Sequence, residues 1–513
     1  MLIHNAEIEA ESRSSLRVLG GRITARGRHL EAYPGEPVID AQGGALLPGL
    51  HDHHLHLLAL AAARVSLECG PPALSTRHDF ESALQQAAAL RDPETWIRGV
   101  GYFESVAGDL DRWQLDPHTG SVPTRIQHRS GALWILNSRA VERLGVEATR
   151  GEPGVEVDHS GAVTGRLFGR DRWLRERLGV PDAPALHDVS RELAAYGVTG
   201  LTDATPHNGS DEARLFSRAQ SEGQLLQSLR LMGGRELMTT AFPAVGERKL
   251  LLREDTLPTF EALCADIRFA HAHQRGVAIH CVTHAELVFA LEAFAAAGVR
   301  PGDRVEHAAI AAPAAVARLA TLGICVVTQP NFIAERGDAY ATDVASCDRP
   351  YLYRGRGFLD AGVALGGGTD APFGHPDPWR AMRAAVDRKT AGGAVFAADE
   401  ALSPERALRL FTSRAEAPGG AARALLPGAP ADLCLLDRDW RAARERLSSD
   451  CVRLTLCAGV PAFGGEEAPT DFGWEGGSSA LGPGEAPVDF GPNAGQEECF
   501  REATTWSSRI STE

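Results

Sequence analysis

Eight short β-type runs alternate with helical stretches between about residues 46 and 370, and this alternation constrains the fold more than any other feature. The stretches between the runs are rich in Ala, Leu, Arg and Glu, which favour helices. Strands that alternate with helices form parallel βα units, and eight such units can close into a barrel. We therefore predict an α/β fold, a (β/α)8 TIM barrel. The expected strands are 46–56, 198–204, 229–233, 248–252, 276–282, 304–308, 324–329 and 363–370.

The two ends of the chain have a different pattern from its middle. Near the start, "LRVLGGRITARGR" alternates apolar and polar residues in short runs separated by glycines, which is typical of small antiparallel strands. The same pattern returns near the end in "LLPGAPADLCLLDRDW". We predict that residues 1–48 and 405–465 build one small composite β-sandwich domain, and that the barrel occupies residues 49–404.

Two further segments do not belong to a regular barrel. The interval of about 65–190 is longer than one βα connection requires, so we expect it to be an insertion over the barrel mouth. Residues 466–513 are rich in Gly, Pro and Glu without periodicity, and we expect this acidic tail to be disordered.

Charge and composition exclude several classes of function. The 513 residues include 67 acidic and 52 basic side chains, and the net charge of −15 makes nucleic acid a poor partner. No apolar run is long enough to cross a bilayer, and the first residues do not resemble a signal peptide. Nine cysteines without a CxxC pair indicate reduced thiols. We expect a cytoplasmic protein with a small-molecule partner; a homodimer is an assembly that the sequence leaves open.

Histidines gather at the end of the first predicted barrel strand, in "HDHHLH". His54 and His56 are two residues apart, so they share one face of the strand, while His51 and His53 share the other face. The carboxyl ends of barrel strands carry the chemistry of such enzymes, and His54 and His56 lie there. We expect these two side chains to hold a metal ion, and His51 and His53 to make a surface or interdomain contact.

Three other strand ends supply ligand types that suit the same ion. His280 ends the run "GVAIHCV", His307 ends "DRVEHA", and Asp370 follows "ALGGGT". Imidazole and carboxylate are the ligands of Zn²⁺ and similar divalent ions. Packing alone would not explain so many strand-end histidines, because each buried imidazole would need its own hydrogen-bond partner.

These residues resemble the amidohydrolase superfamily. The segment "LLPGLHDHHLH" is similar to its Pro-Gly-…-Asp-x-His-x-His signature, and the order HxH, His, His, Asp is similar to its metal site. The resemblance covers about residues 1–465. Within the superfamily, "WIRGVGYFES" and "GVTGLTDA" resemble the branch called amidohydrolase family 3, which includes N-substituted formamide deformylase.

The resemblance implies a role for each strand-end residue. His54 and His56 would bind the more buried metal, His280 and His307 would bind a second, and Asp370 would be both a ligand and the catalytic proton shuttle. A carboxylated lysine bridges the two ions in two-metal members of the superfamily, and Lys249 in "GERKLLLRED" takes that place. A solvated lysine in a charged turn is the alternative interpretation of Lys249. One or two divalent ions, with Zn²⁺ as the expected metal, would be the cofactor.

The chain also departs from the pattern of this branch at three places. Thr283 and His284 stand where the branch has Gly and Asp, "KLLLRED" replaces a Lys-x-x-x-Asp-Gly pattern, and Ala132 replaces a histidine. These changes lie around the expected metal centre, so they bear on the substrate more than on the fold.

The expected activity is hydrolysis of a small-molecule C–N bond, in an amide, N-formyl or N-acyl group, by a metal-activated water. A lactonase, a cyclic amidase or an amino-heterocycle deaminase would use the same residues and stays open, because specificity is set by loops. A non-catalytic scaffold is a third hypothesis, which predicts the loss of at least one ligand, whereas all five of His54, His56, His280, His307 and Asp370 are present.

Overall fold

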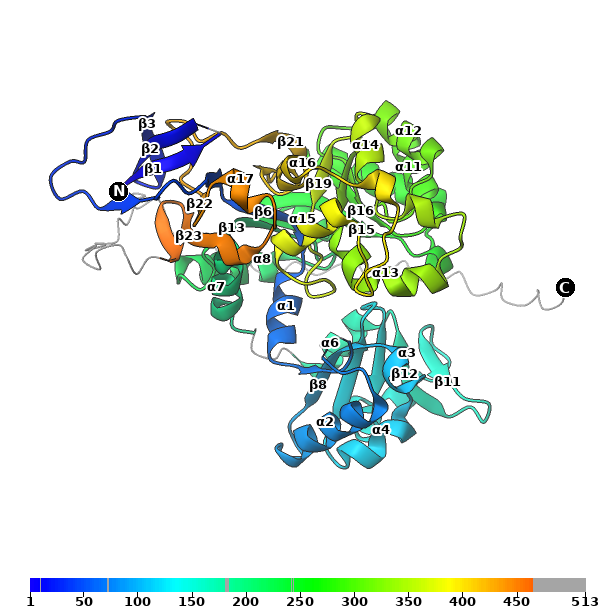
Figure 1. Cartoon of the computed structure of the whole chain (residues 1–513). Helices are drawn as coiled ribbons and strands as arrows, with labels where there is room; N and C mark the ends of the chain where they lie inside the picture. The colour runs from blue at the N-terminus through cyan, green and yellow to red at the C-terminus, as the bar shows by residue number, and fades with distance from the viewer. Residues whose placement is uncertain (10, 72, 180–183, 241, 243, 465–513) are drawn as a thin grey trace, which may run out of the picture. The chain divides into compact units, whose positions relative to one another are not determined.

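Eight parallel strands form the central sheet of the computed structural model, which describes residues 1–464 except 10, 72, 180–183, 241 and 243. Their order in the sheet follows the chain, from the first strand to the last (Figure 1). The predicted (β/α)8 TIM barrel is therefore confirmed. The strands are β6 (Leu50–Leu55), β13 (Val198–Asp203), β14 (Ser228–Gly233), β15 (Val245–Leu251), β16 (Val277–Cys281), β17 (Arg304–His307), β18 (Cys325–Thr328) and β19 (Leu365–Gly367).

The first and last strands meet through the residues that follow β19. The Asp370 amide donates to the His54 carbonyl oxygen over 2.7 Å, and the Thr369 amide donates to the Asp52 carboxylate over 3.1 Å. A Cβ on Gly368 would lie 2.5 Å from the Cβ of His54, closer than atoms approach without a shift, so a glycine is needed there. These contacts bring the ends of β6 and β19 together.

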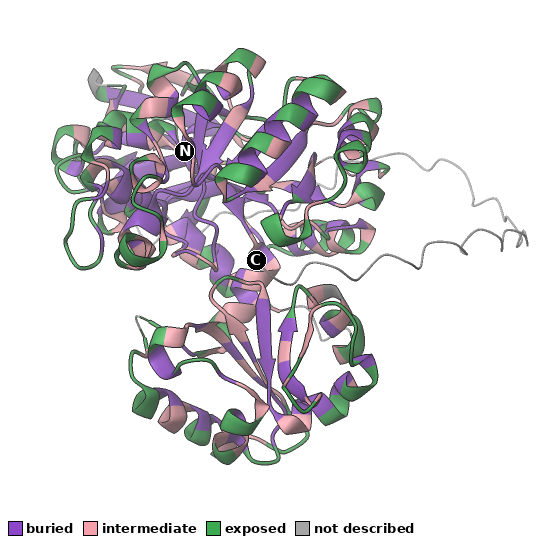
Figure 2. Ribbon diagram, turned by 90° about the vertical axis from the view of Figure 1, so that its right-hand side faces the viewer, coloured by how far each residue is buried: buried purple, intermediate pink, exposed green. Residues whose placement is uncertain are grey.

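Helices cover the outside of the barrel and turn their apolar faces toward it. The strands are buried, whereas the outward sides of the helices are exposed (Figure 2). Helix starts follow local signals: Thr283 and Glu286 form a capping box, and Pro313 opens its helix at the first position. The helices are α1 (Leu57–Arg64), α7 (His187–Ala195), α8 (Ser210–Ser221), α9 (Arg235–Met238), α10 (Phe260–Ala272), α11 (His284–Ala297), α12 (Pro313–Leu322), α13 (Asn331–Asp343), α14 (Arg356–Asp360), α15 (Pro378–Asp387) and α16 (Pro404–Arg409).

The first predicted strand, 46–56, divides into two. β5 (Leu46–Pro48) pairs antiparallel with β22 (Leu433–Leu436), outside the barrel, and β6 begins after Gly49. A Cβ on Gly49 would lie 2.3 Å from the Thr199 side chain, so the glycine lets the chain pass close to β13 as it enters the barrel.

Strands from the two ends of the chain share one hydrophobic core. Ile3 and Leu16 from the start pack in the same cluster as Leu435 and Leu456 from the end. We propose that the two sheets form the composite β-sandwich that the sequence predicts. The strands not yet given are β1 (Leu2–Ile8), β2 (Glu11–Leu19), β3 (Arg22–Gly27), β4 (Val38–Asp40), β23 (Val452–Cys457) and β24 (Val460–Phe463). One sheet has the order β3-β2-β1-β4 and the other has the order β24-β23-β22-β5. Two more strands, β20 (Ser413–Arg414) and β21 (Ala417–Ala422), form a separate hairpin, and helix α17 (Trp440–Ala443) follows β22.

The interval between α1 and α7 holds a six-stranded sheet of its own. Tyr102 and Ile126 belong to one hydrophobic cluster of this segment, and Trp134 and Leu167 belong to another. Its elements are β7 (Leu67–Glu68), α2 (Arg77–Ala89), β8 (Ile97–Tyr102), α3 (Glu104–Ala107), α4 (Arg112–Thr119), β9 (Thr124–His128), β10 (Leu133–Leu136), α5 (Ser138–Leu144), β11 (Val155–Val157), β12 (Val163–Phe168) and α6 (Asp171–Leu178).

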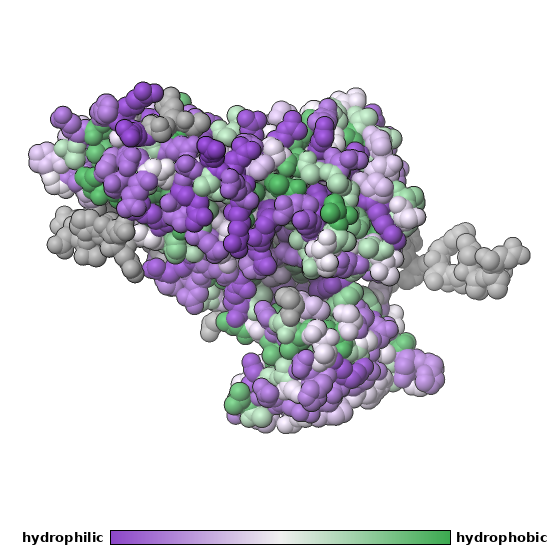
Figure 3. Space-filling model, in the orientation of Figure 1, coloured by the Kyte–Doolittle hydropathy of each residue, from purple (hydrophilic) through white to green (hydrophobic). Residues whose placement is uncertain are grey.

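The described surface is mixed in polarity. Hydrophilic and hydrophobic side chains are interspersed on the face that Figure 3 shows. Within the described ranges, no helix has the length and apolarity that a membrane crossing requires. The tail that the sequence predicts to be disordered, 466–513, lies outside the described residues.

The shared core of the chain ends makes a testable prediction about β2. Leu16 is fully buried, whereas Leu19 on the same strand is 71% exposed. We expect Leu16→Ala to lower the free energy of unfolding by about 2–5 kcal/mol, because it removes buried methyl groups and leaves a cavity. Leu19→Ala, the matched control, should change it by less than about 0.5 kcal/mol. Urea unfolding of both variants checks this, and equal effects would contradict the packing.

Candidate functional site

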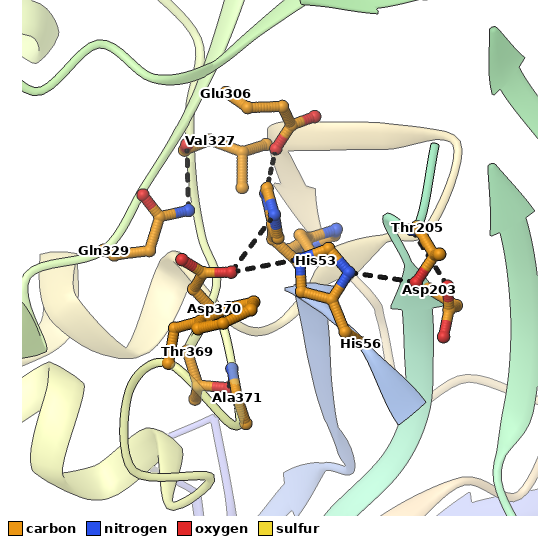
Figure 4. Close-up of polar contacts among 12 residues, drawn as sticks. His53, His56, Asp203, Thr205, Glu306, Val327, Gln329, Thr369, Asp370 and Ala371 are labelled. Atoms are coloured by element: carbon orange, nitrogen blue, oxygen red, sulfur yellow. Dashed lines mark hydrogen bonds and ion pairs between the residues drawn. The ribbon is translucent and has the colours of Figure 1, made fainter. Parts of the chain in front are cut away.

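Two histidines and one aspartate converge where β6 and β19 end. The Oδ1 atom of Asp370 lies 3.5 Å from the Nε2 atom of His54. It lies 3.3 Å from the Nε2 atom of His56, and Figure 4 shows these two side chains facing each other. One ligand atom from each of the three residues lies within 4.8 Å of the other two. This donor set, two imidazoles and a carboxylate, fits a divalent ion such as Zn²⁺, with room for further ligands.

Neighbouring side chains fix the orientation of both imidazoles. His54 Nδ1 contacts the Glu306 carboxylate over 2.5 Å, and His56 Nδ1 contacts the Thr205 hydroxyl over 2.9 Å (Figure 4). Because each Nδ1 atom is engaged, the Nε2 atoms are the ones turned toward Asp370. Hydrogen-bonded partners of this kind set the tautomer and basicity of metal-binding histidines.

A buried arginine holds Glu306 in its ionised form. Arg304 donates from Nε to the second oxygen of Glu306 over 2.6 Å, and both side chains are at most 1% exposed. Burial alone would raise the pKa of Glu306, but the Arg304 cation outweighs it and holds that pKa below its usual value. Burial lowers the pKa of His54 far below its ordinary value, so this imidazole is neutral and able to bind a metal.

The other predicted ligands lie beside this cluster. The ring of His307 is 4.9 Å from that of His54 and 4.4 Å from that of His280, centroid to centroid. His280 and His307 are not members of the donor set that lies within 4.8 Å. Burial lowers the pKa of His280 to about 3, and its imidazole is therefore neutral. The structure thus brings three histidines together from β6, β16 and β17.

Lys249 is buried on β15 and is not the solvated lysine of the alternative interpretation. Its side chain is 3% exposed, and its Nζ atom makes no hydrogen bond with any residue that the structure describes. The Nδ1 atom of His307 is equally buried and equally without a partner among these residues. Burial lowers the pKa of Lys249, which favours the neutral amine. Two orphaned nitrogen atoms beside the donor set fit a site that a bound group would complete.

Lys249 is also unusual in this chain, a signal that the prediction of the site did not use. The sequence contains two lysines, Lys249 and Lys389, against 50 arginines. Lys389 is exposed. Lys249 is therefore a buried lysine in a chain whose basic side chains are almost all arginines. A primary amine can carry out chemistry that a guanidinium does not.

Of the two contacts expected for His51 and His53, the surface contact is wrong, and the interdomain contact stays a prediction, because Ser413, the partner of His53, belongs to the segment 405–465. Both histidines are at most 3% exposed; His51 contacts the Thr202 hydroxyl and His53 contacts the Ser413 hydroxyl. The reason is that a barrel strand is buried on both faces, one toward the barrel interior and one toward the covering helices, and every residue of β6 is buried. The alternation itself holds, since the rings of His51 and His53 lie 4.6 Å apart, centroid to centroid, while His54 and His56 both face Asp370.

The sequence does not predict Glu306 as a site residue, because side chains alternate along a regular strand and Glu306 would then face away from His307. The backbone at His307 has a φ of 67° and that at Asp370 has a φ of 56°, both in the left-handed region that residues other than glycine rarely adopt. A turn of the chain directly after Glu306 brings neighbours in sequence to the same site. Strained backbone of this kind gathers at functional sites.

The contact between Glu306 and His54 predicts an effect on metal affinity. We expect Glu306→Gln to weaken binding of Zn²⁺ about 10- to 100-fold, because His54 loses the carboxylate that orients and polarises its ring. Titration with a competing chelator measures this affinity. Glu292→Gln, at a side chain 55% exposed on α11, is the control. Unchanged affinity in folded Glu306→Gln protein would contradict the role of Glu306.

Comparisons with known proteins agree with this geometry. A profile described as "Amidohydrolase family" matches residues 37–463. The chain is 27% identical over 509 residues to N-substituted formamide deformylase from Arthrobacter pascens, covering 86% of this chain and 93% of that protein. It is 24% identical to the putative amidohydrolase YtcJ from Bacillus subtilis (strain 168), covering 73% of this chain and 80% of the relative.

Solved structures share the fold. A metal-dependent hydrolase from Pyrococcus horikoshii OT3 gives a TM-score of 0.66 at 20% identity, covering 86% of this chain and 98% of the other. N-isopropylammelide isopropylaminohydrolase from Burkholderia multivorans ATCC 17616 gives 0.51 at 20% identity, covering 90% and 97%. Because the profile spans most of the chain and includes the entire His-His-Asp cluster, this chain belongs to the amidohydrolase family and is an enzyme.

Proposed function

We propose that the protein hydrolyses a C–N bond of a small molecule, in an amide, N-formyl or N-acyl group, with a divalent metal at His54, His56 and Asp370. One observation carries this proposal: the three donors converge at the carboxyl end of the barrel strands in a member of the amidohydrolase family. The name of the deformylase relative, which acts on formamides, favours an acyclic amide.

The residues of the chain divide the chemistry among them. A divalent ion, when bound, lowers the pKa of its water from about 16 toward about 7 and polarises a carbonyl oxygen. His54 and His56 would hold the ion through Nε2, because Glu306 and Thr205 engage their other ring nitrogens. Asp370 accepts the proton of the attacking water on its carboxylate and donates it to the leaving nitrogen. The products are a carboxylic acid and an amine.

We further propose that the site takes two ions, with Zn²⁺ as the metal, and that His280, His307 and a carboxylated Lys249 complete it. The buried, unpartnered Nζ atom of Lys249 and Nδ1 atom of His307 support this arrangement. A neutral amine is the form of lysine that reacts with CO₂, and burial lowers the pKa of Lys249 in that direction. The resulting carbamate would be an anion among the cations of the site.

The proposal is tested with zinc-loaded protein and a panel of N-formyl and N-acyl amines, lactones, cyclic amides and amino-heterocycles. Release of a primary amine together with a carboxylic acid supports amide hydrolysis. Acid without amine, or ammonia from the heterocycles alone, would replace it by a lactonase or a deaminase. No product from any compound would contradict a C–N hydrolase.

Asp370 should be required for turnover of the amide substrate. We expect Asp370→Asn to reduce kcat by about 10²- to 10⁴-fold, because an amide side chain does not shuttle the proton. Steady-state kinetics on the best amide of the panel checks this, with metal content measured in parallel. A kcat within threefold of the native value would exclude the proton-shuttle role.

Lys249 should control how much metal the protein holds. Native protein prepared without chelator should contain about two equivalents, and Lys249→Ala should fall toward one or none, because the bridging anion is lost. Plasma mass spectrometry measures the content, and Lys389→Ala, at the other lysine, is the matched control. About one equivalent in all three proteins would remove Lys249 from the site.

A further inference from the structure

Phe373 connects the metal site to the segment between α1 and α7. Its ring lies edge-on to His56, a proposed metal ligand, with centroids 5.5 Å apart. Gly131 approaches the same ring so closely that a Cβ there would lie 2.6 Å from it. The turn that contains Gly131 therefore contacts the ring that packs on His56.

Two arginines stand beside this turn. Arg336 on α13 donates to the Phe373 carbonyl oxygen over 2.5 Å and packs on the Phe332 ring at 4.1 Å. Arg129 precedes Gly131 by two residues and stacks on Phe103. Both side chains are half-buried. Burial lowers the pKa of Arg129, and the positive charge of Arg336 lowers it further, so the two cations lie close enough to repel.

A third arginine reaches the same region from the segment that follows β15. Arg253 follows Lys249 by four residues, and its Nη1 atom is 3.2 Å from the place of a Cβ on Gly169. The amide of Gly169 donates to the Ala132 carbonyl oxygen over 2.8 Å, which places Arg253 at the turn that carries Gly131. We call Arg129, Arg253 and Arg336 the arginine rim.

No member of the arginine rim forms a salt bridge in the part of the chain that the structure describes. Glu104 and Asp343 act on Arg129 from a distance, but Glu104 is paired with His128. Glu335, next to Arg336, also acts on it from a distance and accepts hydrogen bonds from the His375 amide and from Asn331. Half-buried cations without a salt-bridge partner carry a desolvation cost, which an anionic ligand would offset.

We propose that the arginine rim binds a carboxylate of the substrate, so that the enzyme acts on amides that carry an acid group, such as N-acyl or N-formyl amino acids. This inference rests on the proposed C–N hydrolysis and names its substrate class. Guanidinium groups pair with carboxylates through two parallel hydrogen bonds, which gives both charge and direction. The rim at the approach would hold the acid while the amide carbonyl reaches the metal site.

The test separates binding from reaction by using ketone analogues in which CH₂ replaces the amide NH. The zinc-loaded protein is titrated by calorimetry with 2-benzyl-4-oxopentanoate and with 5-phenylpentan-2-one, which differ only in the carboxylate. An aliphatic pair, 2-methyl-4-oxopentanoate and pentan-2-one, covers a smaller pocket. We expect the acid of at least one pair to bind about 10- to 100-fold more tightly than its neutral counterpart, the effect of a charge-assisted contact.

Variants of the rim then decide where that preference comes from. In Arg129→Gln and Arg336→Gln, the ratio of the two dissociation constants should fall toward one. Arg218→Gln removes the same charge at a side chain 78% exposed on α8, and should keep the native ratio. No preference in either pair, or a preference that survives in both rim variants, would overturn the inference.

Hydrolysis is measured separately, as amine released from N-acetylphenylalanine and from N-(2-phenylethyl)acetamide. A higher kcat/KM for the acid, reduced mainly through KM in the rim variants, supports the substrate class. If no amine is released while the ketone acid still binds preferentially through the rim, the proposed reaction is overturned and the anion site stands.

Discussion

The seam between the first and last barrel strands is the contact on which the site depends. The Thr369 hydroxyl and the buried Asp52 carboxylate, 317 residues apart in sequence, meet over 2.5 Å, and the Asp370 amide binds the His54 carbonyl next to them. Burial raises the pKa of Asp52 to about 7, even though Thr369 and two backbone amides favour the charged form. The His-His-Asp cluster has members on both sides of this seam. A displacement of β19 along β6 would therefore separate the ligands before it disturbed the rest of the barrel.

Buried ion pairs inside the barrel also help to fix the residues of the site. Barrel interiors are usually filled by branched aliphatic side chains, but here Arg304 pairs with Glu306, and Arg230 pairs with Glu247 over 2.8 Å. Each of these four ions has a partner, which limits the cost of removing it from water. Through Glu306 this network reaches His54 and sets which ring nitrogen faces the ion. The same low-dielectric interior favours neutral imidazoles and a neutral Lys249, so one physical cause prepares both kinds of ligand.

The sequence predicts the barrel well because its evidence is local. Each strand is a short apolar run, and strand ends with histidine or aspartate meet at one edge of any parallel sheet. Features that depend on partners far along the chain were not accessible in this way. The burial of His51 and His53 depends on Thr202 and Ser413, which contact them from distant parts of the chain. The position of Glu306 depends on a left-handed backbone at the next residue, which no composition or periodicity reports. The division at Gly49 depends on a strand that arrives from residue 433 onward.

The two-residue spacing of His54 and His56 on β6 has a consequence for how this site can change over generations. Substitutions of single side chains around these histidines alter one contact at a time. Deletion of His53 would instead move His54 and His56 by one position along the strand, and both side chains would face the other way. His54 and His56 would both be present and both be misdirected. The ligand pair therefore depends on the spacing of residues in β6 as much as on their types. Insertions and deletions in β6 are the changes that the site tolerates least.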